Sequence, residues 1–145
     1  MKITQLQIKE MAEHLDTGMN VYINPVTGEI ESLPNELHHP LVEKELWQEI
    51  RDKIDMGWES FKLIEPIDSR ESFYIMEAFV ETVSNEKLKD RLIHALNRSK
   101  PFHNFKYEID YSGEYHEKWF ALKLQSLIEY VKEELDAMEI DYDKE

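Results

Sequence analysis

The chain has 145 residues, a length typical of one domain with a single hydrophobic core. Hydrophobic residues make up 41% of it and glycine and proline are few, which excludes an intrinsically disordered chain and disfavours a loop-rich all-β fold. The sequence has no cysteine, which excludes disulfides and thiol catalysis, and its net charge of −14 opposes binding to nucleic acid or anionic lipid over the whole surface.

The first predicted element is a helix that begins after Thr4, whose hydroxyl suits a helix cap. Gly18 stands where a left-handed residue often ends a helix. The predicted buried face of this helix consists of Ile8, Met11, Ala12 and Leu15.

Charges recur every few positions in the first residues, and no stretch of the chain approaches the ~20 apolar residues of a membrane span. We therefore expect a cytoplasmic protein with no membrane contact.

A β-hairpin is predicted next. Two short β-branched runs, 21–23 and 29–33, flank the sequence Asn-Pro-Val-Thr-Gly at residues 24–28. Proline presets such a turn and glycine supplies the positive φ that closes it. Because a lone hairpin is marginally stable in water, a third short strand is expected within residues 60–67, where Pro66 should end it.

Helices are predicted from Leu41 to Met56 and through the second half of the chain. Asp68 or Ser69 can cap one helix, and Ser84 can cap the next. The predicted apolar stripe of the helix at 41–56 is Val42, Leu46, Trp47, Ile50 and Ile54. The corresponding positions in the next two helices are Phe73, Ile75, Met76, Phe79, Val80, Val83, Leu88, Leu92, Ala95 and Leu96.

Two further helices complete the prediction. Pro101 suits the first position of a short helix, and Ser112 with Gly113 separates it from a long last helix. The residues expected to point inward from the short helix are Phe102, Phe105 and Ile109. The predicted seam of the last helix is Phe120, Leu124, Leu127, Val131 and Met138, with Leu135 at its edge.

These elements together predict an α+β fold that is mostly helical. We expect a single domain over residues 1–145, with a small antiparallel β-hairpin or three-stranded sheet near the N-terminus. The acidic tail, about residues 139–145, is expected to fray, since chain ends are poorly ordered unless something ties them down.

Several segments resemble a family of uncharacterised bacterial proteins. The matching stretches are VYINPVTGEIESL, SFYIMEAFVETV, LKDRLIHALNRSKPFHNFKYEI and EKWFALK. They share with that family a strand followed by Thr-Gly-Glu, an Ile-Met-Glu-x-Phe helix, a Leu-x-x-Ala-Leu helix, a Phe-x-x-Phe-Lys turn and a last helix containing tryptophan. The resemblance covers about residues 18 to 135 and implies no activity, cofactor or catalytic residue. His103 and Asn104 stand here where the family often has a basic pair.

The segment from Lys87 to Tyr107 is basic within an acidic chain. It holds six basic residues and one acid, so its net charge is +5 and the remainder of the chain carries −19. One interpretation is a site for a phosphate or another anion, with the candidate residues Arg98, Lys100, His103 and Lys106. The other is pairing with the acidic last helix of the same molecule. The helical spacing of the neighbouring phenylalanines favours the second interpretation, because it places both rings in the core.

The sequence gives no assignment of a metal, a cofactor or a catalytic residue. No two histidines are four residues apart, and there is no nucleophile elbow or glycine-rich phosphate loop. His94, His103 and a carboxylate could form a metal site across a turn, but ordinary half-buried histidines are the commoner explanation. Glu77 lies within an apolar helix, where structural pairing is again more common than catalysis.

The leading functional hypothesis is a small non-enzymatic module that binds another protein or regulates one, through an acidic face. It rests on two observations: the predicted helices have clear apolar stripes and capping residues, and the sequence lacks a catalytic motif. The alternative is an enzyme or binding protein for a phosphorylated or otherwise anionic small molecule, which would use residues 87–107. Nucleic acid binding is disfavoured, because the charge of −19 outside this segment repels a polyanion. Oligomeric state cannot be read from the sequence.

Overall fold

The computed structural model describes residues 2–144. They form two compact units: one contains the chain up to Pro66 together with the part from Leu127 onward, and the other contains Ile67–Ser126. The single domain expected over 1–145 stays a prediction. Six α-helices and a three-stranded antiparallel sheet occur within residues 2–144, which confirms the mostly helical α+β fold.

The first helix, α1 (Gln5–Asp16), begins and ends as its sequence predicts. The Thr4 hydroxyl accepts a hydrogen bond from the Gln7 backbone N–H at 3.1 Å, and the Gln7 side chain accepts one from the Thr4 N–H at 2.9 Å. This reciprocal pair satisfies two N–H groups that the first turn leaves open. All four predicted apolar residues are buried, and Gly18 has a φ of +80° just past the helix end.

The predicted hairpin forms from β1 (Met19–Ile23) and β2 (Ile30–Pro34). Its turn is held by the Asn24 side chain, which accepts hydrogen bonds from the backbone N–H groups of Val26 and Thr27, and Gly28 has a φ of +78°. The third strand, β3 (Lys62–Ile64), pairs with β1, so the strand order is β2-β1-β3 and all pairs are antiparallel.

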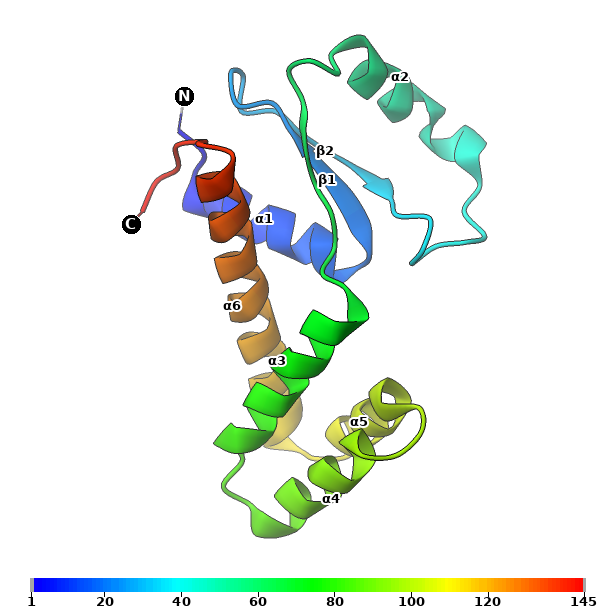
Figure 1. The fold of residues 1–145 in the computed structure, drawn as a ribbon, viewed down its shortest axis with the longest axis vertical. Coiled ribbons are helices and arrows are strands. Elements are labelled where there is room, and N and C mark those ends of the chain that lie inside the picture. Colours follow the sequence, from blue (N-terminus) through cyan, green and yellow to red (C-terminus); the bar gives the residue numbers. More distant parts are fainter. Residues whose placement is uncertain (1, 145) are drawn as a thin grey trace. The chain divides into compact units, whose positions relative to one another are not determined.

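The register of the strands gives the sheet two different faces. Val21 stands opposite Ser32 and Ile64, and this face is buried against α1. The last helix, α6 (Glu114–Ala137), contributes its C-terminal part to the same unit. The other face carries Glu31 and Leu33 and is covered by α2 (Gln48–Met56). Figure 1 shows α1 and α2 on opposite sides of the strands. Lys53 of α2 pairs with both Glu29 and Glu31 of the hairpin, and these two carboxylates raise the pKa of Lys53 above its usual value.

The predicted apolar stripe of residues 41–56 is largely wrong. A 3-10 turn, η1 (Lys44–Trp47), precedes α2, and only Ile54 of the predicted stripe is buried. Leu46 is 76% exposed, while Val42, Trp47 and Ile50 are half-buried. A 3-10 helix has three residues per turn, compared with 3.6 in an α-helix. The side chains of η1 therefore do not line up with those of α2.

The tail makes backbone contacts with the start of the chain as far as Asp143, its fraying stays a prediction, and Glu145 lies outside the described residues. Ile3 and Tyr142 form a parallel bridge, in which the Asp143 N–H donates to the Ile3 carbonyl at 2.7 Å. Ile140 and Tyr142 are each 8% exposed. Burial raises the pKa of the Tyr142 phenol above its usual value of 10.0. Because these apolar side chains are buried beside the start of the chain, the acidic composition of the tail does not decide its structure.

The second unit contains α3 (Ser69–Thr82), α4 (Glu86–Leu96), α5 (Pro101–Asp110) and the first part of α6. Asp68 caps α3, as predicted, but Asn85 rather than Ser84 caps α4, and the Ser84 hydroxyl is hydrogen-bonded to Tyr115 instead. Three rings at the centre of this unit meet edge to face, with centroids 4.8–6.3 Å apart: Phe79, Phe105 and Trp119.

Two predicted inward-pointing phenylalanines are in fact half exposed. Phe105 is 2% exposed, as predicted, but Phe102 is 40% exposed. Helical side chains tilt toward the N-terminus of their helix, so the ring of the second residue of α5 extends past the end of the packed helix. Phe120 of α6 is 49% exposed, whereas Leu135, which was expected at the edge, is fully buried. Leu127 and Val131 of the predicted seam are buried as expected, so the prediction for α6 is wrong at Phe120 and in placing Leu135 at the edge.

Candidate functional site

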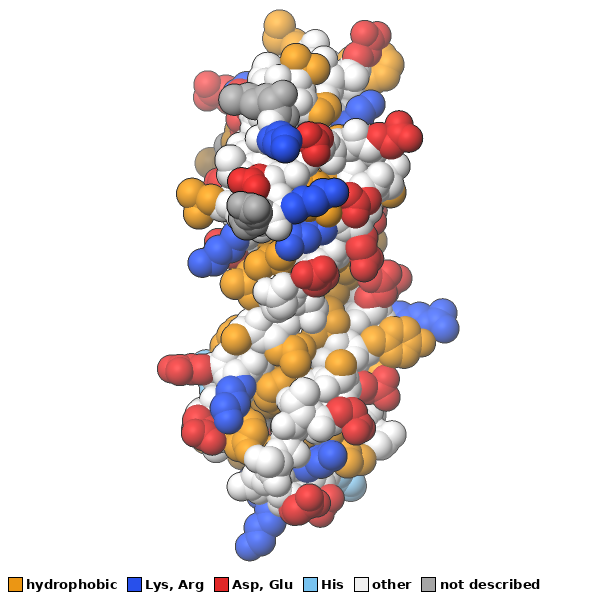
Figure 2. All heavy atoms as spheres, turned by 90° about the vertical axis from the view of Figure 1, so that its left-hand side faces the viewer, with side chains coloured by type: hydrophobic (Ala, Val, Ile, Leu, Met, Phe, Trp, Pro, Cys, Tyr) orange, Lys and Arg blue, Asp and Glu red, His pale blue; other side chains and the backbone are white. Residues whose placement is uncertain are grey.

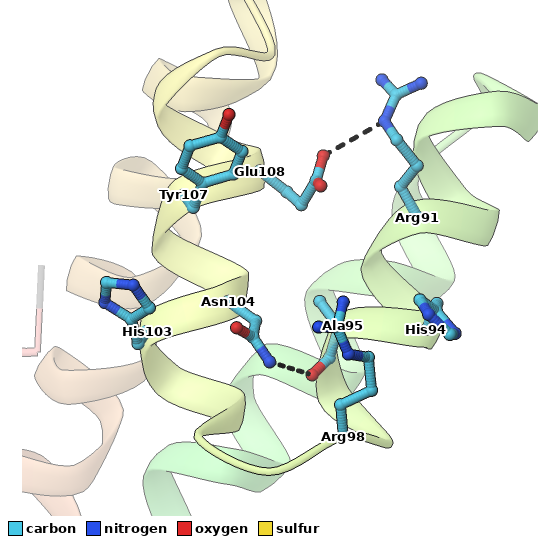
Figure 3. A pocket seen from close by; sticks show the side chains of 8 residues that line it. All are labelled: Arg91, His94, Ala95, Arg98, His103, Asn104, Tyr107 and Glu108. Carbon is cyan, nitrogen blue, oxygen red and sulfur yellow. Dashed lines mark hydrogen bonds and ion pairs between the residues drawn. The ribbon is translucent and has the colours of Figure 1, made fainter.

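A groove between α4 and α5 gathers polar side chains from both helices of the second unit. Apolar residues pack the two helices together, and residues 97–100 connect them. The groove has a cavity volume of about 190 Å³. Its lining, shown in Figure 3, consists of Arg91, His94, Ala95, Arg98, His103, Asn104, Tyr107 and Glu108. Every one of these residues lies in or beside the basic segment identified in the sequence.

The turn between the helices is fixed by backbone conformation and by one amide. Lys100 is left-handed, with a φ of +57°, and this reverses the chain immediately before Pro101 occupies the first position of α5. The Asn104 side chain donates to the Ser99 carbonyl at 2.8 Å and to the Ala95 carbonyl at 3.4 Å. The amide thereby holds the start of α5 against the end of α4, which defines the width of the groove at this end.

An ion pair crosses the groove at its other end. Arg91 Nε donates to Glu108 Oε2 at 3.1 Å (Figure 3). The Glu108 side chain is 26% exposed and that of Arg91 is 54% exposed, so the contact is only partly shielded from solvent. Within residues 2–144, the two terminal nitrogens of Arg91 have no protein partner. They remain able to donate to a ligand.

The structure separates the four residues that the sequence proposed as an anion site. Arg98 lines the groove from the turn after α4 and His103 lines it from α5, and neither has a hydrogen-bond or ionic partner among the described residues. Lys100 and Lys106 do not line it. Lys106 instead donates to Asp110 Oδ2, at 2.6 Å, one turn further along α5.

The carboxylates that pair with this basic segment are therefore on α5. Glu108 pairs with Arg91 and Asp110 pairs with Lys106, and neither belongs to the last helix, where the sequence placed the acidic partner. Helix α6 contributes a base to this cluster, because His116 Nε2 lies 3.4 Å from Asp110 Oδ1.

We expect Lys106→Met to raise the pKa of Asp110. The hydrogen bond from Lys106, with a smaller contribution from the charges of Lys106 and His116, lowers the pKa of Asp110 below its usual value of 3.8. A lowered pKa contributes stability that is present above the unfolded pKa and is lost as the pH falls through the folded pKa. The variant should therefore lose less stability on acidification. Carboxyl NMR titration would show a higher Asp110 pKa in the variant than in the unsubstituted protein, and an unchanged pKa would contradict this account.

An aromatic edge on α5 was missed by the sequence reading. His103, Tyr107 and Tyr111 are spaced four residues apart, so they lie on one face of the helix. The two tyrosines are 59% and 78% exposed, and their ring centroids are 5.0 Å apart. The spacing was visible in the sequence, but only the packing of α5 shows that this face is left open to solvent.

A second groove, in the first unit, is mainly apolar. Its cavity volume is about 490 Å³, and it is lined by Met19, Pro34, His38, His39, Pro40, Leu41, Val42 and Trp47. We call it the apolar groove. Leu41 is 93% exposed, and Leu37 and Leu46 from the same stretch of chain are 92% and 76% exposed. His39 Nε2 is hydrogen-bonded to the Thr17 carbonyl at 2.8 Å, which holds one wall against the end of α1.

Of the other candidates from the sequence, His94 lines the α4–α5 groove, whereas Glu77 lies outside both grooves. Glu77 is exposed to solvent on α3. Within residues 2–144, no group of three or more histidine, aspartate or glutamate side chains is placed to hold a metal ion. None of the helices in this part of the chain is both long enough and apolar enough to cross a membrane.

Comparison with known proteins found a matching family and a related protein. A model of the Uncharacterised protein family UPF0158 matches residues 1–145. The UPF0158 protein PA5073 of Pseudomonas aeruginosa is 26% identical over 141 residues, which cover 97% of this chain and 87% of that protein. No solved structure matches the chain significantly. The family match spans the whole sequence and agrees with the resemblance seen in its motifs, so the chain belongs to the uncharacterised bacterial family UPF0158.

Proposed function

We propose that this protein is a non-enzymatic cytoplasmic module that binds another protein through the apolar groove. The observation that carries the proposal is a highly exposed leucine at a concavity of the first unit that is lined mainly by apolar residues. Leu41 is 93% exposed at a groove that also contains Trp47. Single exposed apolar residues are ordinary on protein surfaces, but a gathered apolar patch is typical of an interaction site.

The chemistry of the groove suits a partner's side chains. Its volume of about 490 Å³ is large enough for one or two apolar side chains of a partner, and tryptophan is enriched among residues that dominate binding energy at interfaces. Polar contact is also available, because His38 lies at the rim and is exposed. Binding here would cover Leu41, which otherwise remains in water at a cost of roughly 25 cal/mol for each Å² of apolar surface.

An acidic face, which the sequence suggested as the contact surface, receives less support. On the face drawn in Figure 2, acidic and basic side chains are interspersed, with hydrophobic ones between them. A mixed surface gives weak electrostatic attraction to a basic partner, because opposite charges on it compensate each other within a Debye length of about 8–10 Å.

Site-specific photocrosslinking in the native cells tests the proposal. A photoreactive residue at position 41 should give a discrete crosslinked protein, whereas the same residue at Leu6, which is 76% exposed on α1, should not. In purified form, Leu41→Glu should abolish capture of that partner, while Leu6→Glu should leave it intact. Both sites are exposed, so the free energy of unfolding should change by less than about 0.5 kcal/mol in either variant.

The salt dependence of partner capture distinguishes binding through the apolar groove from binding through a charged surface. Contact through apolar side chains should persist at about 1 M salt, where the Debye length is roughly 3 Å. The proposal fails if the crosslinks at positions 41 and 6 are equal, if Leu41→Glu retains the partner, or if moderate salt releases it.

A further inference from the structure

The α4–α5 groove combines unpaired basic groups with an exposed aromatic edge, and nothing in the proposed protein-binding role uses either. Arg98 projects from the turn that follows α4 and His103 projects from α5, and neither has a partner among residues 2–144 (Figure 3). Arg91 contributes two free terminal nitrogens, since its ion pair with Glu108 uses only Nε. Donors from two helices therefore converge on one small cavity.

These donors suit a phosphate group. A guanidinium presents several N–H groups in a fixed fork that matches phosphate oxygens, and a protonated histidine adds one more charge-assisted donor. Arg98 is the principal group in this respect, because no carboxylate of the described residues competes for it. Glu108 neutralises Arg91 in part, and its oxygens can accept hydrogen bonds from hydroxyl groups of a ligand.

The aromatic edge extends the same groove. Tyr107 is both a lining residue and 59% exposed, and Tyr111 continues the edge one turn further with its ring centroid 5.0 Å away. These rings have no place in the core of the unit, which is centred on Phe79, Phe105 and Trp119. An exposed ring beside a phosphate site offers a flat surface on which a nucleobase can stack.

We propose that the α4–α5 groove binds a mononucleotide. Its phosphate lies between Arg98 and His103 and also reaches the free end of Arg91, while its base stacks on Tyr107. The ribose hydroxyls face Glu108. This ligand class uses both features of the groove, whereas inorganic phosphate would use only the basic one.

Charge outside the groove favours a single nucleotide over a nucleic acid strand. The chain without residues 87–107 carries −19, and that charge repels a polyanion wherever the strand extends beyond a Debye length of about 10 Å. The cavity volume of about 190 Å³ is also small, so it accommodates one phosphate group with the base resting on the open aromatic edge.

Calorimetric and NMR titrations of the full chain test the proposal with four probes: AMP, ribose 5-phosphate, inorganic phosphate and a short single-stranded RNA. AMP should bind about tenfold more tightly than ribose 5-phosphate, because only AMP has a base to stack. Arg98→Gln should weaken both ligands at least about tenfold, as expected for loss of a charge-assisted contact. Tyr107→Ala should reduce the affinity for AMP to that for ribose 5-phosphate, which should itself be unchanged.

Matched controls come from the same unit. Lys106→Gln removes a base that pairs with Asp110 outside the groove, and Tyr74→Ala removes a tyrosine that is 52% exposed on α3. Neither should alter binding by more than about twofold. If no phosphate compound binds, or if Arg98→Gln has no effect, the phosphate site is wrong. If AMP and ribose 5-phosphate bind equally, the stacking surface is wrong, and tighter binding of the RNA than of AMP would identify a strand as the ligand.

Discussion

Phe105→Ala is expected to lower the free energy of unfolding of the second unit by about 3–5 kcal/mol. Phe105 is 2% exposed, and its ring lies edge to face against Trp119 and Phe79, at centroid distances of 4.8 and 6.3 Å. Removal of the ring leaves a cavity among side chains that are themselves fully packed, so the loss of transfer free energy and the loss of contacts add. Urea denaturation followed by circular dichroism measures the change.

The matched control is the same substitution three residues earlier on the same helix. Phe102 is 40% exposed, so Phe102→Ala should cost less than about 1 kcal/mol. Both changes delete the same atoms and alter helix propensity equally, and the difference between them therefore isolates burial. Equal losses of stability would mean that Phe102 is buried in solution, as its sequence spacing predicted.

Gly18→Ala is expected to lower the free energy of unfolding of the first unit by about 2–4 kcal/mol. Two separate costs combine. Gly18 has a φ of +80°, where a residue with a Cβ atom is strained, and a Cβ built there would lie 2.7 Å from the Cβ of His38. It would also lie 3.0 Å from Nε2 of His39, the nitrogen that is hydrogen-bonded to Thr17. Thermal and urea denaturation measure the effect.

Gly113→Ala separates the two costs. Gly113 has a φ of +68°, but no atom outside its immediate chain neighbours lies within 4 Å of a Cβ built there. This variant should lose about 1–2 kcal/mol from backbone strain alone. A loss at Gly18 no larger than at Gly113 would show that the loop carrying His38 moves aside freely, and that it is not held against the end of α1.

Local features of the fold were predictable because each depends on a few neighbouring residues. The hairpin at 24–28 is set by proline and glycine conformation, and the caps at Thr4 and Asp68 use side chains that reach only three residues ahead. The paired bridge between Ile3 and Tyr142 joins opposite ends of the sequence, and no local pattern indicates it. The acidic composition of the tail pointed the other way.

In the candidate site too, contacts within one helix were predictable from the sequence, whereas contacts between helices were not. The pairing of Lys106 with Asp110 follows from a spacing of four residues on one helix, and so does the aromatic edge, although neither was read from the sequence. The ion pair between Arg91 and Glu108, by contrast, joins residues 17 apart. It depends on how α4 and α5 pack, as does the meeting of Arg98 and His103 at one cavity.

The bridge between Ile3 and Tyr142 belongs to a unit that contains both ends of the chain, which has a consequence for folding during synthesis. The unit formed by Ile67–Ser126 is one continuous stretch, so all of its residues have been synthesised before Leu127 is added. The other unit begins first, but its buried residues include Leu127, Val131 and Leu135, so its core can be completed only after these have been synthesised. The middle of the sequence can thus reach its native state before the beginning does.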